Sequence, residues 1–263
     1  MRGDAPASRQ FPVRQWVAWF AGLYCLALVA EAPARAMAWA VDRVTGGMVC
    51  LTAERGSFWR GEAEVVLPGR DPTLAAVPLG RVQWRWGPTE LLSGAAVIDV
   101  RQAGATTWGQ FRFDRTGARV RGLVLDVPAS LLAHVMPVGG WRPDGELHLE
   151  IRSLRWSNGV QAGQVDGRWR RARLGGPGGE ELGSCELRLN ARAGVVSYRI
   201  VPTEGPVRLS GGGEWLPGAS LSFHGELDLR LGGGLLRPLI RGSGREIGPD
   251  RYRFDIDMRH RAG

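Results

Sequence analysis

Glu-Leu-His-Leu-Glu-Ile-Arg, residues 146–152, gives the clearest indication of the fold. Leu147, Leu149 and Ile151 share one parity, and the residues between and beside them are polar or charged. Because successive side chains of a β-strand point to opposite faces of a sheet, this alternation predicts a strand that is buried on one face only. A strand of this kind is typical of an antiparallel sheet with one apolar face.

The same alternation recurs on both sides of this strand. Residues 79–86 place Val82, Trp84 and Trp86 on one face, and residues 251–258 alternate in the same way. Further strands are expected at 48–54, 95–101, 106–114, 119–127, 160–172, 186–191, 195–201, 206–215 and 219–231. The 39 glycines and 16 prolines of the 263-residue chain fit frequent turns between them.

We therefore predict a mainly β fold with two or three short helices, at 88–94, 129–136 and 233–240. Long helices are too few to cover the apolar face, so the sheet is expected to curl into an open barrel, a groove or a sandwich-like body. The Gly-rich segment 174–183 is the candidate boundary between two half-sheets.

An uncharged apolar run, Trp-Val-Ala-Trp-Phe-Ala-Gly-Leu-Tyr-Cys-Leu-Ala-Leu-Val-Ala, occupies residues 16–30. It covers roughly 22 Å as a helix, and extension to residues 13–34 reaches the ~30 Å of a bilayer core. The sequence therefore predicts one N-terminal transmembrane helix. The residues assigned to this anchor are Trp16, Trp19, Phe20, Leu23, Leu26 and Leu28, of which the two tryptophans fit an aromatic belt at the membrane interface.

Three arginines and a single acid precede this run, so the positive-inside rule places the N-terminus in the cytoplasm. The expected organisation is a cytoplasmic leader at 1–14, a transmembrane anchor at 15–35 and a periplasmic β-rich domain at 36–263, which opens with a helical stalk. A cleaved signal peptide and a buried core helix are the alternatives, and a cleaved signal would leave the domain in the same compartment.

Composition and motifs point away from catalysis. The net charge of +8 comes from arginine alone and is scattered along the strands, which indicates solvated outward faces and no nucleic-acid partner. The four histidines, His134, His148, His224 and His260, include no helical i, i+4 pair. The acids are dispersed, and no nucleophile elbow or phosphate loop is present. We therefore expect no enzymatic activity, no cofactor and no metal.

The three cysteines allow one structural question. Cys25 lies within the apolar run and acts as a small hydrophobic residue. Cys50 and Cys185 would both lie in an oxidising compartment, and their pairing is left open because the sequence does not place them within bridging distance.

An aromatic pair bracketed by glycines, Gly-Ser-Phe-Trp-Arg-Gly-Glu-Ala at residues 56–63, predicts a hairpin or bulge whose rings cap the end of a core. A second motif, Val-x-Trp-x-x-x-Pro-x-x-Leu-Leu-x-Gly, spans residues 82–94. On these motifs the chain resembles the type II secretion system protein N family. The residues that carry the resemblance are Gly56, Ser57, Trp59, Gly61, Ala63, Trp84, Pro88, Leu91, Leu92 and Gly94.

This resemblance implies a non-catalytic protein that is anchored in the bacterial inner membrane and carries a periplasmic β-rich domain. It would act in the machine that moves folded proteins across the outer membrane, with other subunits of that machine as partners. The alternative is a periplasmic lipid-binding or lipid-transfer module whose apolar groove holds acyl chains. Co-purifying phospholipid would separate the two functions.

Overall fold

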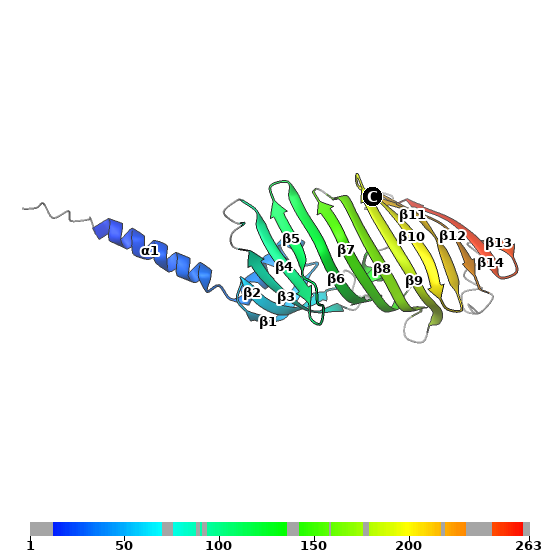
Figure 1. The fold of residues 1–263 in the computed structure, drawn as a ribbon, viewed down its shortest axis with the longest axis horizontal. Coiled ribbons are helices and arrows are strands. Elements are labelled where there is room, and N and C mark those ends of the chain that lie inside the picture. Colours follow the sequence, from blue (N-terminus) through cyan, green and yellow to red (C-terminus); the bar gives the residue numbers. More distant parts are fainter. Residues whose placement is uncertain are drawn as a thin grey trace, which may run out of the picture.

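The computed structural model describes residues 13–69, 76–87, 90, 94–135, 142–157, 159–175, 179–216, 219–229 and 244–259. Within these residues fourteen strands form one antiparallel sheet (Figure 1). The first half of the sheet consists of β1 Cys50–Gly56, β2 Arg60–Leu67, β3 Val77–Gly87, β4 Ala96–Gln102, β5 Gly109–Asp114, β6 Gly117–Pro128 and β7 Pro143–Trp156. The second half consists of β8 Val160–Leu174, β9 Glu180–Arg192, β10 Val195–Glu204, β11 Arg208–Leu216, β12 Ser220–Asp228, β13 Arg245–Gly248 and β14 Arg251–Arg259.

Each strand from β1 to β11 pairs with the next strand in the chain. The order changes only at the end, where β14 pairs with β12 and β13 forms the outer edge. The prediction of a mainly β fold with one curled antiparallel sheet is therefore confirmed. Strand β13 was not predicted, because four residues are too few to display an alternation.

The sheet is continuous across the segment that was predicted to separate two half-sheets. β8 and β9 pair directly, and their register runs from Ala162 opposite Arg192 to Leu174 opposite Glu180. Residues 180–183, the end of the predicted Gly-rich boundary, thus belong to β9. Backbone hydrogen bonds hold this end of the strand, and Gly183 takes a φ of +100° where the register shifts.

Three helices are described: α1 Val13–Ala30, α2 Ala34–Thr45 and the short α4 Leu131–Val135. Pro33 in extended backbone starts α2, and Gly46 in the left-handed region ends it, with the Gly47 N–H donating to the Asp42 carbonyl. No helix within the described residues combines the length and the apolar character needed to span a membrane. The helix predicted at 233–240 and most of the turn predicted at 88–94 lie outside the described residues.

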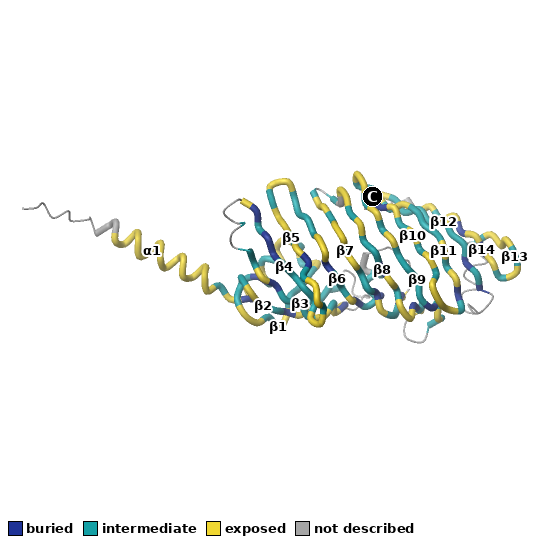
Figure 2. Tube along the Cα trace, in the orientation of Figure 1, coloured by how far each residue is buried: buried dark blue, intermediate teal, exposed yellow. Residues whose placement is uncertain are grey.

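The buried core is concentrated at the two ends of the sheet. One cluster joins α2 to the first strands, around Ala63 and Trp84, and a second gathers Leu227, Tyr252 and Phe254 near the other end. Figure 2 shows that the strands between them are mostly of intermediate or exposed burial. The two buried clusters therefore lie toward the ends of the sheet, while the middle strands contribute separate buried residues such as Leu147, Val127 and Ala172.

The apolar face nevertheless continues through this middle region. One row places Leu125, Leu149, Gly167, Leu187 and Ile200 opposite one another across β6 to β10. The four large side chains of the row are only partly buried. Of the described helices, only α2 packs extensively on the sheet, and it covers β1 and β2. Val127 and Leu147, which lie on the same face beside this row, are buried, so only part of the middle of the apolar face is accessible within the described part of the chain.

Candidate assembly site at the joint between helix and sheet

The glycine–aromatic motif forms the turn between β1 and β2. The Ser57 N–H donates to the Arg60 carbonyl at 2.8 Å, and the Arg60 N–H donates to Ser57 Oγ at 3.1 Å. Gly56 has a φ of +92°, and a Cβ there would lie 2.5 Å from the Arg60 carbonyl oxygen. Only glycine fits this position, so the predicted hairpin is confirmed and its first glycine is explained.

The second glycine of the motif makes room for a tryptophan of the neighbouring strand. Gly61 in β2 pairs with Trp84 in β3, and a Cβ on Gly61 would lie 2.6 Å from Trp84 Cζ2. Trp84 is 2 % exposed, and its indole N–H donates to the Phe58 carbonyl at 3.0 Å. Ala63, two residues further along β2, is completely buried. The two motifs therefore meet in one packed unit.

This unit holds the carboxyl end of α1. The Trp59 indole N–H donates to the Val29 carbonyl at 2.8 Å, and the Phe58 N–H donates to the Ala32 carbonyl at 2.7 Å. Pro33 and Ser57 form an isolated antiparallel bridge beside them. Val29 lies in the last turn of α1, where carbonyls lack partners within the helix, and Ala32 lies in the connection that follows, so the turn supplies a donor to each.

Aromatic rings surround these hydrogen bonds. Phe58 stacks on Trp86 with ring centroids 5.1 Å apart, and Trp59 meets Trp86 edge to face at 5.9 Å. The backbone N–H of Trp86 donates to the backbone carbonyl of Trp59 at 2.8 Å. Among the described residues the indole nitrogen of Trp86 is buried and has no hydrogen-bond partner. Two rings of the turn and one ring of β3 thus fix the position of the turn beside the end of α1.

Helix α2 packs on the same unit with one side. Ala34, Met37 and Val41 face the cluster around Ala63 and Trp84. The opposite side carries Arg35, Trp39 and Arg43, which are spaced one turn apart and are all exposed. The sequence predicted this helix only as a stalk. The i, i+4, i+8 spacing of these three residues was the signal that could have identified the outer face.

The structure brings six of the ten motif residues together at the joint: Gly56, Ser57, Trp59, Gly61, Ala63 and Trp84. Gly94 is described with a φ of +75°, and a Cβ on it would meet nothing within 4 Å. Pro88, Leu91 and Leu92 lie outside the described residues. The residues assigned to the membrane anchor, Trp16, Trp19, Phe20, Leu23, Leu26 and Leu28, lie on α1 and are 56 to 72 % exposed.

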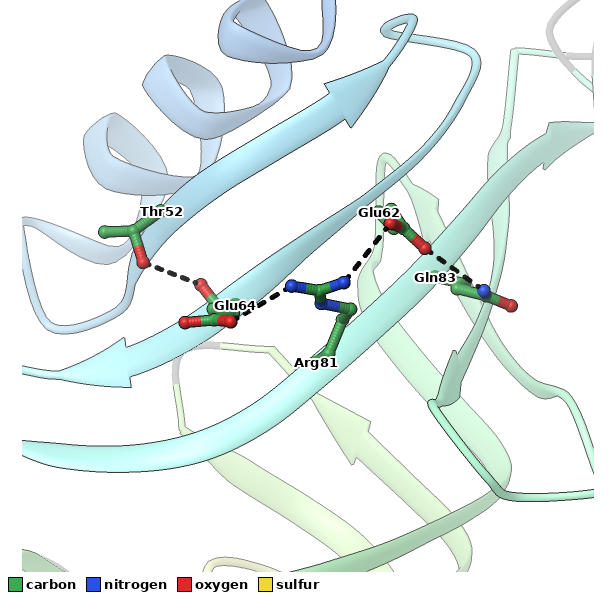
Figure 3. Close-up of polar contacts among 5 residues, drawn as sticks. All are labelled: Thr52, Glu62, Glu64, Arg81 and Gln83. Carbon is green, nitrogen blue, oxygen red and sulfur yellow. Dashed lines mark hydrogen bonds and ion pairs between the residues drawn. The ribbon is translucent and has the colours of Figure 1, made fainter.

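The other face of the sheet carries a ladder of paired charges. Figure 3 shows Arg81 of β3 between two carboxylates of β2, Glu64 at 3.1 Å and Glu62 at 3.5 Å. The Gln83 side chain donates to Glu62 at 3.3 Å and thereby extends the ladder along β3. Similar pairs, such as Arg85 with Asp99 and Arg168 with Glu186, continue it across the sheet. Charged side chains directly opposite one another stabilise strand pairing modestly, and here they mark the solvated face.

This face offers no visible chemistry. A hollow of about 590 Å³ over β7 to β9 is lined by residues that include the ion pairs Arg152–Asp166 and Arg168–Glu186. No group of three or more His, Cys, Asp or Glu side chains is placed to hold a metal ion anywhere in the described residues. His148, considered from the sequence, instead contacts Asp126 across the strands at 2.7 Å. The described face therefore gathers paired charges rather than a reactive group.

Perturbed groups elsewhere have structural causes. Burial raises the pKa of the Cys185 thiol to about 11, and burial raises the pKa of Tyr198 to about 12. The Tyr198 hydroxyl donates to the Ser222 carbonyl at 2.6 Å. Cys50 in β1 and Cys185 in β9 both carry free thiols and stand eight strands apart in the sheet order. The question of their pairing is thus answered within one chain: they do not form a disulfide.

Comparison with known proteins gives one match. The family model described as type II secretion system (T2SS), protein N, matches residues 48–255. No curated protein and no solved structure matches the chain. The matched range begins just before β1 and ends within β14, so it contains both motifs and nearly the whole sheet.

Proposed function

The chain belongs to the type II secretion system protein N family, and from this membership we propose that it is a non-catalytic, inner-membrane-anchored component of the machine. In this proposal the sheet lies in the periplasm and contributes to the assembly or operation of the apparatus that exports folded proteins across the outer membrane. The observation that carries it is the family match over residues 48–255.

The position of the motif residues supports this function. The motif residues do not line a reactive pocket. They build and support the turn that is hydrogen-bonded to the end of α1, and they are Gly56, Trp59, Gly61 and Trp84. A protein whose motif serves to hold a helix at a fixed place on a sheet is suited to positioning other subunits. Its mechanism would be positional rather than chemical.

Anchoring through α1 is part of the proposal. The helix has eighteen residues, or about 27 Å, and those from Trp16 to Ala30 are uncharged. Its large apolar side chains are exposed, with Trp19 at 72 %, and its described hydrogen bonds to the sheet are all at its carboxyl end. Insertion of α1 into the inner membrane would remove this apolar surface from water.

Contact with other subunits is proposed to use the edges of the sheet. The strand β13 has four residues and includes the charged Arg245 and Glu246, which are features of a protected edge. The strand β1 has seven residues and is interrupted by a bulge between Thr52 and Arg55. These features oppose unspecific pairing at both edges. We therefore propose that an extended segment of another subunit adds to an edge by main-chain hydrogen bonds only where its charges and register match that edge.

Deletion of the gene tests the proposed function. Secretion of folded exoproteins should fall, with those proteins retained in the periplasm, while export across the inner membrane continues normally. The wild-type gene supplied in trans should restore secretion. A chain whose Trp59 and Trp84 are both replaced by alanine should restore it less well at equal protein level. Unchanged secretion in the deletion strain would contradict the proposal.

A separate experiment tests the topology. Alkaline phosphatase fused after Gly263 should be active in intact cells, because this enzyme requires the oxidising periplasm. The same fusion should remain with the membrane after washing at high salt. An inactive phosphatase fusion together with an active cytoplasmic reporter at the same site would show that the orientation is wrong.

One observation favours a second function, the binding of lipid. The row through Leu149, Leu187 and Ile200 is apolar but only partly buried, and it continues from strand to strand. Acyl chains laid along this face would cover it. Native mass spectrometry of protein purified in mild detergent should then find phospholipid in reproducible stoichiometry, and replacement of Leu187 by aspartate should reduce it. Purified protein that carries no lipid would contradict the lipid-binding function and leave assembly as the only proposed function.

A further inference from the structure

The outer face of α2 is a basic and aromatic surface that the joint does not use. It is defined by Arg35, Trp39 and Arg43, one turn apart on the side opposite Met37 and Val41. Trp39 is 66 % exposed, although other tryptophans of this region, Trp84 among them, are largely covered. An exposed indole between two arginines combines apolar surface with positive charge, and packing of α2 against the sheet uses neither.

The charges of this surface are available for a ligand. Within the described residues neither Arg35 nor Arg43 is paired with a carboxylate, whereas arginines along the sheet are commonly paired. Asp42 is the acid on the same side of the helix, and it leaves the face with a net positive charge. Arg43 also lies in the last turn, where it complements the helix dipole, but this does not account for Arg35 or Trp39.

The surface also lies close to the proposed anchor. Three residues, Glu31 to Pro33, separate the last residue of α1 from the first residue of α2. The bonds from Trp59 to Val29 and from Phe58 to Ala32 hold this connection against the sheet. The outer face of α2 is therefore held near the point where α1 would leave a bilayer.

We propose that Arg35, Trp39 and Arg43 dock α2 on the surface of a bilayer that contains anionic phospholipid, and that this contact sets the orientation of the sheet relative to the membrane. Tryptophan is favoured at the level of the headgroups, where its ring is half apolar and its N–H remains solvated. Guanidinium groups on either side pair with lipid phosphates. The inference rests on the proposed anchoring through α1 and adds a second, peripheral contact to it.

Depth measurements in nanodiscs test this contact in the full chain. The native cysteines Cys25, Cys50 and Cys185 are replaced by alanine, and a bimane label is attached through Ala36→Cys, on the outward side of α2. The matched control carries the label through Ser197→Cys, on an exposed position of β10. Lipids with a nitroxide at the headgroup report which label lies at the membrane surface.

The label at position 36 should be quenched several-fold more than the label at position 197 in discs that contain phosphatidylglycerol. Replacing Arg35 and Arg43 by glutamine should lower the ratio of docked to undocked protein about fivefold for each arginine. For the chain with both arginines unchanged, discs made of phosphatidylcholine alone should lower the ratio of docked to undocked protein to the same extent. Replacement of Trp39 by alanine should weaken the quenching in both kinds of disc.

Two results would overturn the inference in different ways. Equal quenching at positions 36 and 197, in protein that co-elutes with the discs, would leave the anchor in place and reject the docking of α2. If position 36 were then shielded from iodide in water, a second protein copy would be the occupant instead. Failure of the chain to co-elute with discs would reject the anchoring itself, and the surface contact with it.

Discussion

Gly61→Ala is the sharpest test of how the joint is packed. A methyl group at this position would lie 2.6 Å from Trp84 Cζ2 and 2.6 Å from the Arg55 carbonyl oxygen. The Ser57 carbonyl oxygen would be at 3.0 Å. Two of these three atoms belong to the backbone of the turn, so relief requires the turn or the buried indole to move.

The expected loss of stability follows from these contacts. Overpacking of a tightly packed site costs about 1–3 kcal/mol, and contact with backbone atoms places this case at the upper end. Removing a glycine restricts the unfolded chain and offsets about 0.4–1 kcal/mol of that cost. The net destabilisation is therefore about 2 kcal/mol, which lowers the melting temperature of a domain of this size by about 4–8 °C.

Thermal unfolding followed by tryptophan fluorescence and near-ultraviolet circular dichroism measures this shift. Gly248→Ala is the matched control, because a Cβ on Gly248 meets nothing within 4 Å and its φ is ordinary. The control should melt within about 2 °C of the wild-type chain. If Gly61→Ala melts together with the control, the close approach of β2 to Trp84 does not exist in solution.

Three further predictions concern single side chains. Trp59→Phe keeps an aromatic ring but removes the N–H that donates to the Val29 carbonyl. Loss of this hydrogen bond, about 1 kcal/mol, should accelerate amide hydrogen exchange near the end of α1 about fivefold. The overall melting temperature should change little. Hydrogen bonding from Arg253 lowers the pKa of Glu226 below its ordinary value of 4.5. The ionised Glu226 therefore stabilises the folded chain above pH 4.5, and this stabilisation is lost as the pH falls through the lower pKa of the folded state. Glu226→Gln should lower the melting temperature at pH 7 and have no effect in strong acid, as measured by thermal melts across pH. Burial raises the pKa of Cys185 to about 11, so alkylation of this thiol at pH 8 should be slow until denaturant is added. Mass spectrometry measures the extent of alkylation. Rapid labelling of the folded chain would show that the thiol is accessible.

Much of the sheet could be predicted because it has one solvated face. In β7 the apolar residues Leu147, Leu149 and Ile151 alternate with charged partners of the ladder, and such alternation survives wherever only one face is covered. The alternation fails toward the end of the strand, at Arg155 and Trp156, where both side chains are exposed. Pairing there is held by backbone hydrogen bonds, which leave no trace in the pattern of side chains.

The joint was predictable only in part. The motif around Trp59 indicated a turn whose rings close a core, and this is what the residues form. Its attachment to α1 was not foreseen, because the acceptors are the backbone carbonyls of Val29 and Ala32, which every residue possesses. The insertion of α1 into a membrane and the periplasmic location of the sheet stay predictions that rest on the apolar run and the arginines before it.

The sequential order of the strands has a consequence for how the protein grows and varies. From β1 to β12 each new strand finds its neighbour already present just behind it in the chain, so the sheet can form progressively from the end attached to α1. Adding or removing a hairpin near the far end would change the reach of the molecule without disturbing the turn under α1. The length of the sheet is therefore a property that evolution can adjust separately from its attachment to α1.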